Sequence, residues 1–529
     1  MRSGREHATR AGVRVELGPV LTDGVALGAG AGAALQAGPD AAAGRGMRTA
    51  LRAVSNAGAG ADLGAEAAPG PAASDADRIP DGAGTGGRPE GGAVAPAGGV
   101  AAMRRARWRD RRVYTRSHPV LFALLAAVRR RAVVRLGRAV LVSGTEAYRE
   151  ALTRIPLDRA AAGTTGGAAR ELSGGGTLFD QEGADHRDAR RAVAEDLGAA
   201  GVEQLRPVWR AVLDRELAPL AAGQPVDLVP LARELAGATV RAMLDCPAGA
   251  TALAEAAGDA AAAAVRDHLP GPRPPGTARA AARATARLEA LLGGGATSTP
   301  SRTAPTYPHR GKRSPGTTPP CPGGDRRSDP PCDGPGTHPS APGPRPRQAP
   351  TPSHDDIALR AMIAVAAVNT TVAALPRAVA WCADGGLWEQ AADDRLRPVL
   401  VGELLRVVAP SPLLPRVAAA DAVLEGCPVK AGDRLVLVAR HAVGADVDPP
   451  DAHRPAPPAV SRLVFGAGPH ACPGARLALA QLDDVLAALA PYRPAVVTTR
   501  VDRRAALPGW RRLTVRATTT PRPRTENPS

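Results

Sequence analysis

One short loop limits what this chain can fold into more than any other part of its sequence. Residues 465–474 read FGAGPHACPG, and a strongly helical segment, ARLALAQLDDVLAALA, follows directly. Gly466, Gly468 and Gly474 permit backbone angles that other residues avoid, so the loop can wrap closely around a flat ligand. The positive end of the following helix favours a thiolate at Cys472. The loop therefore predicts a site where a sulfur meets a bound group, with a buried structural cysteine as the alternative.

The same ten residues resemble the haem-binding loop of the cytochrome P450 family, FGxGxHxCxG, at every specified position. The resemblance implies that Cys472 is the thiolate ligand of the iron. It also implies that Phe465 packs beside the sulfur, and that His470 contacts a haem propionate. In such proteins the anionic sulfur pushes electron density to the iron and favours cleavage of the O–O bond.

Two features about 55 to 70 residues before the cysteine extend the resemblance. Glu403-Leu-Leu-Arg406 reads ExxR on a predicted helix, where positions three apart share a face and can pair. The segment resembles the K helix of the family, which implies a structural ion pair. The family completes this pair with a further arginine, for which Arg454 is the candidate. Arg416, in LLPRVA, matches the arginine that binds a propionate.

A second helix further upstream resembles the C helix of the family, GxxHxxxRR. His186 and Arg190 stand one helical turn apart in Gly183-Ala-Asp-His186-Arg-Asp-Ala-Arg190, so both can point at one anionic group. A guanidinium suits a carboxylate because it can donate two parallel hydrogen bonds. A solvated helix face is the alternative interpretation.

A long apolar helix predicted over 357–375 contains AAVNTT at residues 366–371, which resembles the oxygen-binding I helix of the family. There the two small alanines leave room over the haem, and Thr370 is expected to hydrogen-bond dioxygen. Alternatively, Thr370 bonds only to carbonyls of its own helix. The usual acidic residue is replaced by Asn369, which cannot ionise. We expect Thr370 and Asn369 to be the catalytic positions, with proton delivery impaired.

Composition divides the rest of the chain. Ala- and Gly-rich or Pro-rich stretches have too few large side chains to offset chain entropy by burial. We therefore expect a disordered extension over 1–102, the two parts of one folded domain over 103–292 and 355–515, a disordered Pro/Ser/Thr/Arg-rich insert over 293–354, and a disordered tail over 516–529.

The formal net charge of +16 suggests nucleic acid as a partner, but the charge is local. Residues 104–116, 129–138 and 293–353 together carry the whole excess, with only Trp108, Tyr114 and Tyr307 as aromatic residues among them, so no nucleic acid is expected. Solvated charge runs are the first interpretation, and contact with a membrane surface or an acidic partner is the second.

The six cysteines include no CxxC pair, which argues against a zinc site or a disulfide framework. The apolar run from Pro119 to Val128 spans ten residues, against roughly 20 needed to cross a bilayer. We therefore expect no transmembrane segment and a cytoplasmic protein.

Together these features predict a mainly α fold with a small β portion, the fold of the cytochrome P450 family, with haem b (iron protoporphyrin IX) between the 357–375 helix and the Cys472 loop. The resemblance implies a monooxygenase that inserts one atom of O2 into a small apolar molecule. Its electrons would come from NAD(P)H through a ferredoxin and a ferredoxin reductase. Two alternatives stay open: a haem-thiolate protein without the normal O2 cycle (a peroxygenase, an isomerase or an inactive relative), and a basic interaction module whose haem motif is vestigial.

Overall fold

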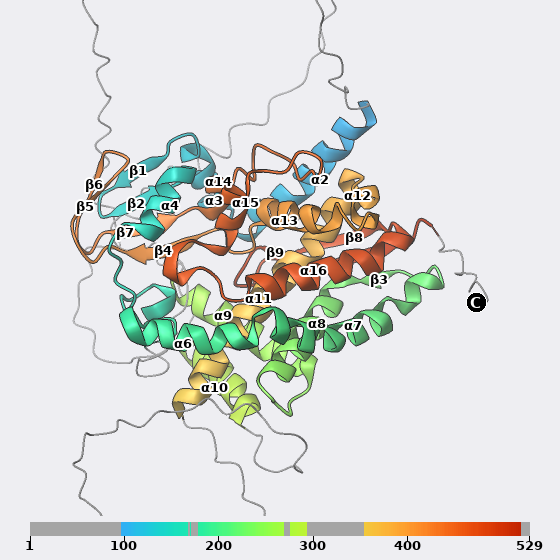
Figure 1. The fold of residues 1–529 in the computed structure, drawn as a ribbon, viewed down its shortest axis with the longest axis horizontal. Coiled ribbons are helices and arrows are strands. Elements are labelled where there is room, and N and C mark those ends of the chain that lie inside the picture. Colours follow the sequence, from blue (N-terminus) through green and yellow to red (C-terminus); the bar gives the residue numbers. More distant parts are fainter. Residues whose placement is uncertain (1–96, 168–169, 171–177, 269–275, 294–353, 520–529) are drawn as a thin grey trace, which may run out of the picture.

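The computed structural model describes residues 97–167, 170, 178–268, 276–293 and 354–519. They form a mainly helical fold with three small sheets, as the sequence predicts (Figure 1). The α-helices are α2 Ala97–Ser117, α3 Pro119–Val128, α4 Thr145–Thr153, α6 Gly183–Asp196, α7 Ala199–Ala221, α8 Leu228–Met243, α9 Ala250–His268, α10 Thr277–Gly293, α11 His354–Gly385, α12 Trp388–Ala392, α13 Arg397–Val408, α14 Ala439–Ala442, α15 Pro458–Ser461 and α16 Ala475–Leu489. Short 3-10 turns are η3 Arg462–Phe465, η4 Gly468–His470 and η5 Ala490–Tyr492.

The sheets join segments that are far apart in the sequence. In the largest sheet the strand order is β1-β2-β7-β4, and β2 runs parallel to β7 with Val140 opposite Leu435. The strands are β1 Val133–Leu136, β2 Ala139–Val142, β3 Val226–Asp227, β4 Leu414–Val417, β5 Ala422–Leu424, β6 Cys427–Val429, β7 Arg434–Leu437, β8 Ala495–Asp502 and β9 Gly509–Arg516. The early and late parts of the chain therefore form one body.

The division of the chain into parts stays a prediction, because most of the expected extension and insert lies outside the described residues. Two boundaries differ from the structure. α2 begins at Ala97, six residues inside the segment assigned to the extension. The tail expected from residue 516 overlaps β9, which ends at Arg516, and Thr518 N donates to Tyr492 O at 3.0 Å. Met103 on this helix packs against Gly385 at the end of α11.

α11 runs through the centre of the fold and packs against α2, α8 and α9. The helix predicted over 357–375 is longer in the structure, because α11 continues through Pro376 to Gly385, and the predicted end is wrong. Proline removes one helical hydrogen bond, but Val379 and Trp381 beyond it are buried, and their burial outweighs that loss. Among the described residues, α11 is also the one helix long and apolar enough to cross a membrane. Its packing on three neighbours makes it an internal helix of this fold.

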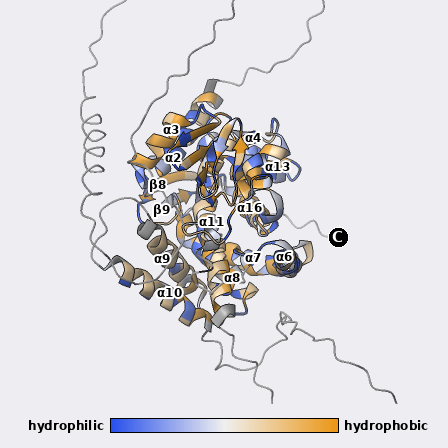
Figure 2. Ribbon diagram, turned by 90° about the vertical axis from the view of Figure 1, so that its left-hand side faces the viewer, coloured by the Kyte–Doolittle hydropathy of each residue, from blue (hydrophilic) through white to orange (hydrophobic). Residues whose placement is uncertain are grey.

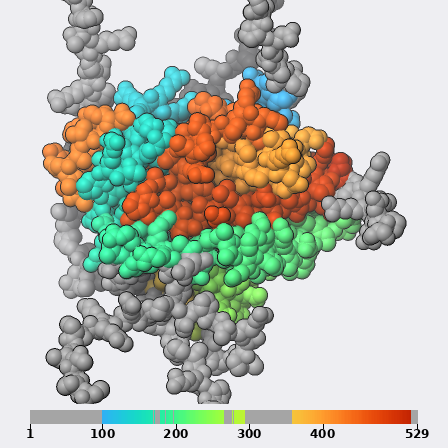
Figure 3. Space-filling view, viewed as in Figure 1, coloured from blue at the N-terminus to red at the C-terminus, as the bar shows by residue number. Residues whose placement is uncertain are grey.

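α16 is fixed against α7 by one buried carboxylate. Asp484 accepts hydrogen bonds from Arg206 Nε at 2.9 Å, Trp209 Nε1 at 2.8 Å and Arg210 Nη2 at 2.7 Å. Figure 3 shows the result as a continuous surface, with green α6 and α7 lying along the red C-terminal part. Because α16 begins directly after the Cys472 loop, this contact also positions the loop.

A buried network of charges ties α2 to α11 and α14. Asp110 Oδ1 accepts hydrogen bonds from Arg377 Nε and Nη2 at 2.8 and 2.7 Å, and its Oδ2 accepts one from Arg440 Nη1 at 3.1 Å. Both guanidinium groups also lie over the ring of Tyr114, 4.5 and 4.1 Å from its centroid. A single carboxylate and one aromatic ring thus stabilise two buried cations.

Asp110→Ala is expected to lower the free energy of unfolding by about 3–5 kcal/mol, because it leaves the Arg377 and Arg440 charges buried without their carboxylate. Denaturant titration followed by circular dichroism measures the loss. Arg111→Ala, on the exposed side of the same helix, serves as the control and is expected to change stability little. Equal effects of the two substitutions would contradict this interpretation of the network.

Candidate functional site

The Cys472 loop is a tight turn between η3 and α16. Its amide closes the turn, since Cys472 N donates to Phe465 O at 2.7 Å. Gly466 and Gly468 have φ angles of +78° and +71°, a region that side chains other than glycine rarely adopt. A Cβ at position 468 would also lie 3.1 Å from the carbonyl oxygen of Leu152. Gly466 and Gly468 are therefore needed for the shape of the loop, whereas Gly474, with φ −82°, adopts angles open to other residues.

The Cys472 thiol is accessible to solvent and free of any disulfide. Burial among surrounding protein atoms raises the pKa of this thiol, while a hydrogen bond from the Gly474 amide and the charge of Arg190 act to lower it. The sulfur also precedes the N-terminus of α16, where the helix dipole favours an anion. The thiol therefore has groups placed to stabilise a thiolate once a cation binds it.

Two histidines bring α6 and the loop together. The rings of His186 and His470 lie with their centroids 3.9 Å apart, tilted by 32°. His186 is buried, and burial followed by the charge of Arg190 lowers its pKa. Burial and the neighbouring Arg159 lower the pKa of His470 to about 3. Both rings are therefore neutral at pH 7 and can donate hydrogen bonds without adding charge.

Three arginines, Arg159, Arg190 and Arg416, lie close to this pair, and acidic partners are few among the described residues. Arg416, on β4, is largely enclosed, and burial together with Arg159 lowers its pKa to about 10. Its Nη1 donates to Pro415 O, whereas its Nε is buried without a partner. Arg159 forms one long ion pair, with exposed Glu182 at 3.8 Å. Arg190 and Arg416 form no ion pair with another described residue. The cluster is thus ready for a ligand with negative charge.

The structure therefore brings His186, Arg190, Arg416, His470 and Cys472 to one place, and their roles toward a haem stay a prediction. The third arginine of the cluster, Arg159, lies in the loop after α4 and was not predicted from the sequence. The sequence around it, PLDRAAAG, has no periodicity or motif that would single out this arginine.

The two residues predicted to be catalytic, Asn369 and Thr370, lie on α11, where each side chain bonds to a carbonyl oxygen of its own helix. Ala366 is exposed on a largely buried helix, which leaves open space next to its small side chain. Thr370 Oγ1, one turn later, donates to Ala366 O at 2.8 Å. Asn369 Nδ2 donates to Val365 O at 2.7 Å and reaches Ala257 O of α9 at 3.4 Å. Within the described part of the chain, no hydrogen bond or ion pair is given that joins Asn369 or Thr370 to the cationic cluster.

The ExxR pair on α13 is formed and almost fully buried. Arg406 Nη2 lies 2.5 Å from Glu403 Oε2, with 1% and 2% of the side chains exposed. Arg406 donates further to the carbonyl oxygens of Val443, Asp448 and Pro449 at 3.2, 3.2 and 3.3 Å. The pair thereby fixes the irregular chain that leads to the Cys472 loop.

The prediction that Arg454 binds to this ion pair is wrong. The side chain of Arg454 is 87% exposed and pairs with Asp451 at 3.5 Å, away from Glu403. Glu403 Oε1 instead accepts the backbone amide of Ala456 at 3.0 Å. A backbone donor completes the network because the chain passes close enough to need no side chain.

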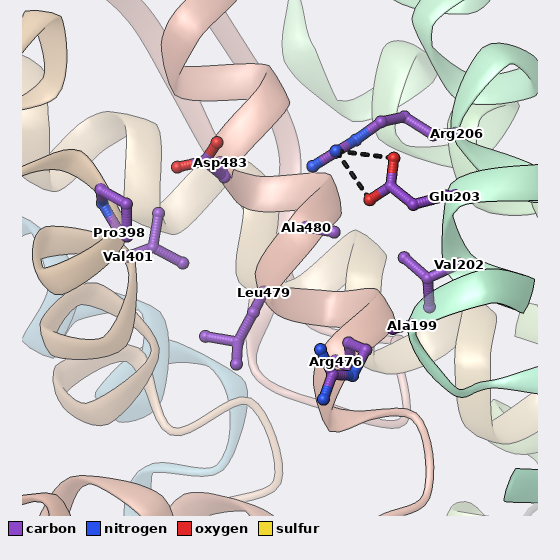
Figure 4. Close-up of a pocket in the computed structure, with 10 residues that line it drawn as sticks. All are labelled: Ala199, Val202, Glu203, Arg206, Pro398, Val401, Arg476, Leu479, Ala480 and Asp483. Atoms are coloured by element: carbon purple, nitrogen blue, oxygen red, sulfur yellow. Dashed lines mark hydrogen bonds and ion pairs between the residues drawn. The ribbon is translucent and has the colours of Figure 1, made fainter. Parts of the chain in front are cut away.

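Two further features of the described residues concern ligand binding. Among the described residues, no group of three or more His, Cys, Asp or Glu side chains could hold an ion by itself. A cavity of about 330 Å³ lies between α7, α13 and α16 (Figure 4), but none of the site residues lines it.

Comparisons with known proteins agree with this geometry. A family profile described as "Cytochrome P450" matches residues 398–489. A curated relative, 20-oxo-5-O-mycaminosyltylactone 23-monooxygenase of Streptomyces fradiae, is 32% identical over 161 residues, which are 28% of this chain and 36% of the relative. The match thus spans about a third of that relative.

Solved structures resemble the whole fold. The cytochrome P450 enzyme CYP109B1 from Bacillus subtilis matches with a TM-score of 0.53 and 17% identity, over 76% of this chain and 99% of that one. CYP105P2 of Streptomyces peucetius matches with a TM-score of 0.52 and 22% identity, over 74% and 95%. At these identities the likeness concerns the fold.

The low pKa of His470 predicts how stability depends on pH in the ligand-free protein. An unfolded histidine takes up a proton near pH 6.5, whereas the folded site resists it down to about pH 3. Since the unfolded state binds more protons in this window, stability falls as the pH is lowered through it. His470→Gln is expected to reduce the loss between pH 7.5 and 5, as measured by urea midpoints. His453→Gln, at an exposed position, is the control. An unchanged pH dependence in His470→Gln would contradict the prediction.

Proposed function

Because this chain belongs to the cytochrome P450 family, we propose that it is a haem-thiolate monooxygenase. In this proposal it inserts one oxygen atom of O2 into a C–H or C=C bond of a small apolar molecule. The observation that carries the proposal is the meeting of a free thiol with a cationic cluster that has few acids of its own. The name of the Streptomyces fradiae relative, a monooxygenase, supports the same reaction class.

The residues present fit a haem. Its two propionates would supply the negative charge that Arg159, Arg190 and Arg416 lack, and the unpartnered Nε of Arg416 fits such an acceptor. His186 and His470, neutral at pH 7, would donate further hydrogen bonds. Cys472 would provide the axial thiolate. When bound, the haem supplies the activation of O2, which a thiolate ligand favours.

The protein's own contribution is to stabilise the thiolate, to fix the shape of the loop and to leave room on α11. The Gly474 amide and the N-terminus of α16 act against the effect of burial and favour the thiolate form of Cys472, and they would limit its basicity as a ligand. Phe465 fixes the loop through its carbonyl bond to the Cys472 amide. The small side chain of Ala366 leaves room on α11 for substrate and O2, and Thr370, one turn away, offers the nearest hydroxyl on that face.

The electron supply belongs to the same proposal. The sequence holds no flavin- or nucleotide-binding motif, so two electrons would come from NAD(P)H through a separate ferredoxin and its reductase. A cytoplasmic location suits these partners and the absence of a disulfide framework from the cysteine spacing.

A second candidate is a haem-thiolate protein without the normal O2 cycle, such as a peroxygenase or an isomerase. Asn369 motivates it, because its amide is engaged with Val365 O and cannot ionise. Product formation driven by hydrogen peroxide, without any reductase, favours this candidate. Turnover that requires the reductase favours the monooxygenase.

Cys472→Ser is expected to abolish the red-shifted Soret band of the reduced, carbon monoxide-bound protein, since a neutral hydroxyl replaces thiolate poorly as a ligand. Cys427→Ser is the matched control, because this half-buried cysteine lies on β6 outside the site. The control is expected to keep the band. If Cys472→Ser has the spectrum of the parent, the proposed ligand is wrong.

Asn369→Asp is expected to raise the product formed per NAD(P)H consumed, and Thr370→Ala to lower it. The new carboxyl group would face the carbonyl oxygen that now accepts the Asn369 amide, which favours its protonated form and keeps a proton at hand. A well-placed general acid contributes roughly 100- to 10,000-fold. Asn369→Ala, which removes the amide without adding an acid, is the control. Coupling in Asn369→Asp no better than in this control would show that another group delivers the proton.

A further inference from the structure

α3 is an unusual surface helix. All ten of its residues, PVLFALLAAV, are apolar, yet Leu125 is the one that is buried. A helix on the surface of a globular protein usually presents charged or polar residues to water, and a helix that is apolar all round is usually covered. Most of α3 is drawn in the hydrophobic colour in Figure 2. Its outer face therefore suits an apolar partner, because its side chains cannot form hydrogen bonds.

The two faces of α3 are clearly distinct. Leu121, Phe122 and Leu125 pack with Leu141 and Val436 of the four-stranded sheet. The opposite face carries Val120 and Leu124, four residues apart, with 58% and 43% of each exposed. Ala123 and Ala127 are exposed beside them. The inner face anchors the helix to a rigid sheet, so the outer face is presented in a fixed orientation.

Cations stand at both ends of this helix. Arg116 precedes it, and Arg129, Arg130 and Arg131 follow it directly; all four are exposed. Within the described residues, no ion pair is given for any of them. The one acidic residue between positions 97 and 138 is Asp110, which is already engaged with two buried arginines. The surface is thus apolar in its middle and positive at its ends, with no negative charge of its own.

We propose that α3 and its flanking arginines form a surface that binds anionic lipid bilayers peripherally. The apolar face lies among the upper acyl chains, and the arginines extend to the lipid phosphates. At ten residues the helix is about 15 Å long, which is too short to cross a hydrocarbon core of roughly 30 Å. An acidic protein would match the arginines but would not explain why the exposed face between them lacks any polar side chain.

The test uses the purified full chain with its haem in a vesicle flotation assay. Vesicles of phosphatidylcholine alone are compared with vesicles containing 30 mol%, roughly a third, of phosphatidylglycerol, at low and high salt. Binding is expected to the anionic vesicles and to weaken at high salt. Arg129→Gln, Arg130→Gln and Arg131→Gln combined are expected to reduce the partition coefficient at least about 10-fold, since each cation near an anionic surface contributes measurably.

A second set of variants tests the apolar face. Val120→Glu with Leu124→Glu, and the uncharged pair Val120→Ser with Leu124→Ser, are each expected to reduce binding, with the Glu pair at least about 10-fold weaker than the parent. Val423→Glu, at a site 62% exposed on β5, is the matched control and is expected to bind like the parent. Circular dichroism and haem content verify that each variant folds.

Two results would overturn the proposal. One is a full chain that does not float with anionic vesicles. The other is binding that depends on the arginines but not on Val120 and Leu124, which would indicate a purely electrostatic surface of the kind that an acidic protein contacts. Neither result depends on catalytic turnover, so the monooxygenase proposal stands or falls separately.

Discussion

The ion pair between Glu403 and Arg406 is the constraint on which the site depends. Both charges are buried, so every remaining donor and acceptor must be satisfied inside the protein. Arg406 uses its spare N–H groups on three backbone carbonyls between residues 443 and 449, and Glu403 accepts the amide of Ala456. This stretch has little regular secondary structure to hold it. The pair on α13 therefore holds this irregular stretch in place through hydrogen bonds to its backbone. The stretch leads to the Cys472 loop, so the pair also helps to fix the position of Cys472.

The cationic cluster has the opposite character, because its charges are not balanced within the protein. Three arginines and two neutral histidines converge from a loop, a helix, a strand and a 3-10 turn. Burial acts against the charged forms of both histidines and of Arg159 and Arg416. Such an arrangement lowers stability on its own and is relieved when an anion binds. If these residues hold a dianionic cofactor, its binding would stabilise the folded state. The unbalanced buried charges lower the free energy of unfolding of the ligand-free protein, and the same charges strengthen the binding of an anion.

The sequence predicts this site well where short-range patterns determine the geometry. The glycines of the Cys472 loop, the i, i+4 spacing of His186 and Arg190, and the i, i+3 spacing of Glu403 and Arg406 each define local structure that the fold retains. The fold class also follows from helical periodicity and the short β segments. Contacts between distant segments are different. Arg159 joins the cluster through a loop without a motif, Ala456 replaces Arg454 through its backbone, and α11 continues past Pro376 because of burial further along. None of these depends on a residue's neighbours in sequence.

The buried Asp110 network has a consequence for how the chain is made. Asp110 belongs to the first described helix, yet its partners Arg377 and Arg440 follow 267 and 330 residues later. A nascent chain leaving the ribosome must therefore keep α2 undocked during most of translation, with its arginines and apolar residues open to chaperones or to premature association. Closing such distant contacts is intrinsically slow. The docking of α2 therefore waits until Arg440 has been synthesised.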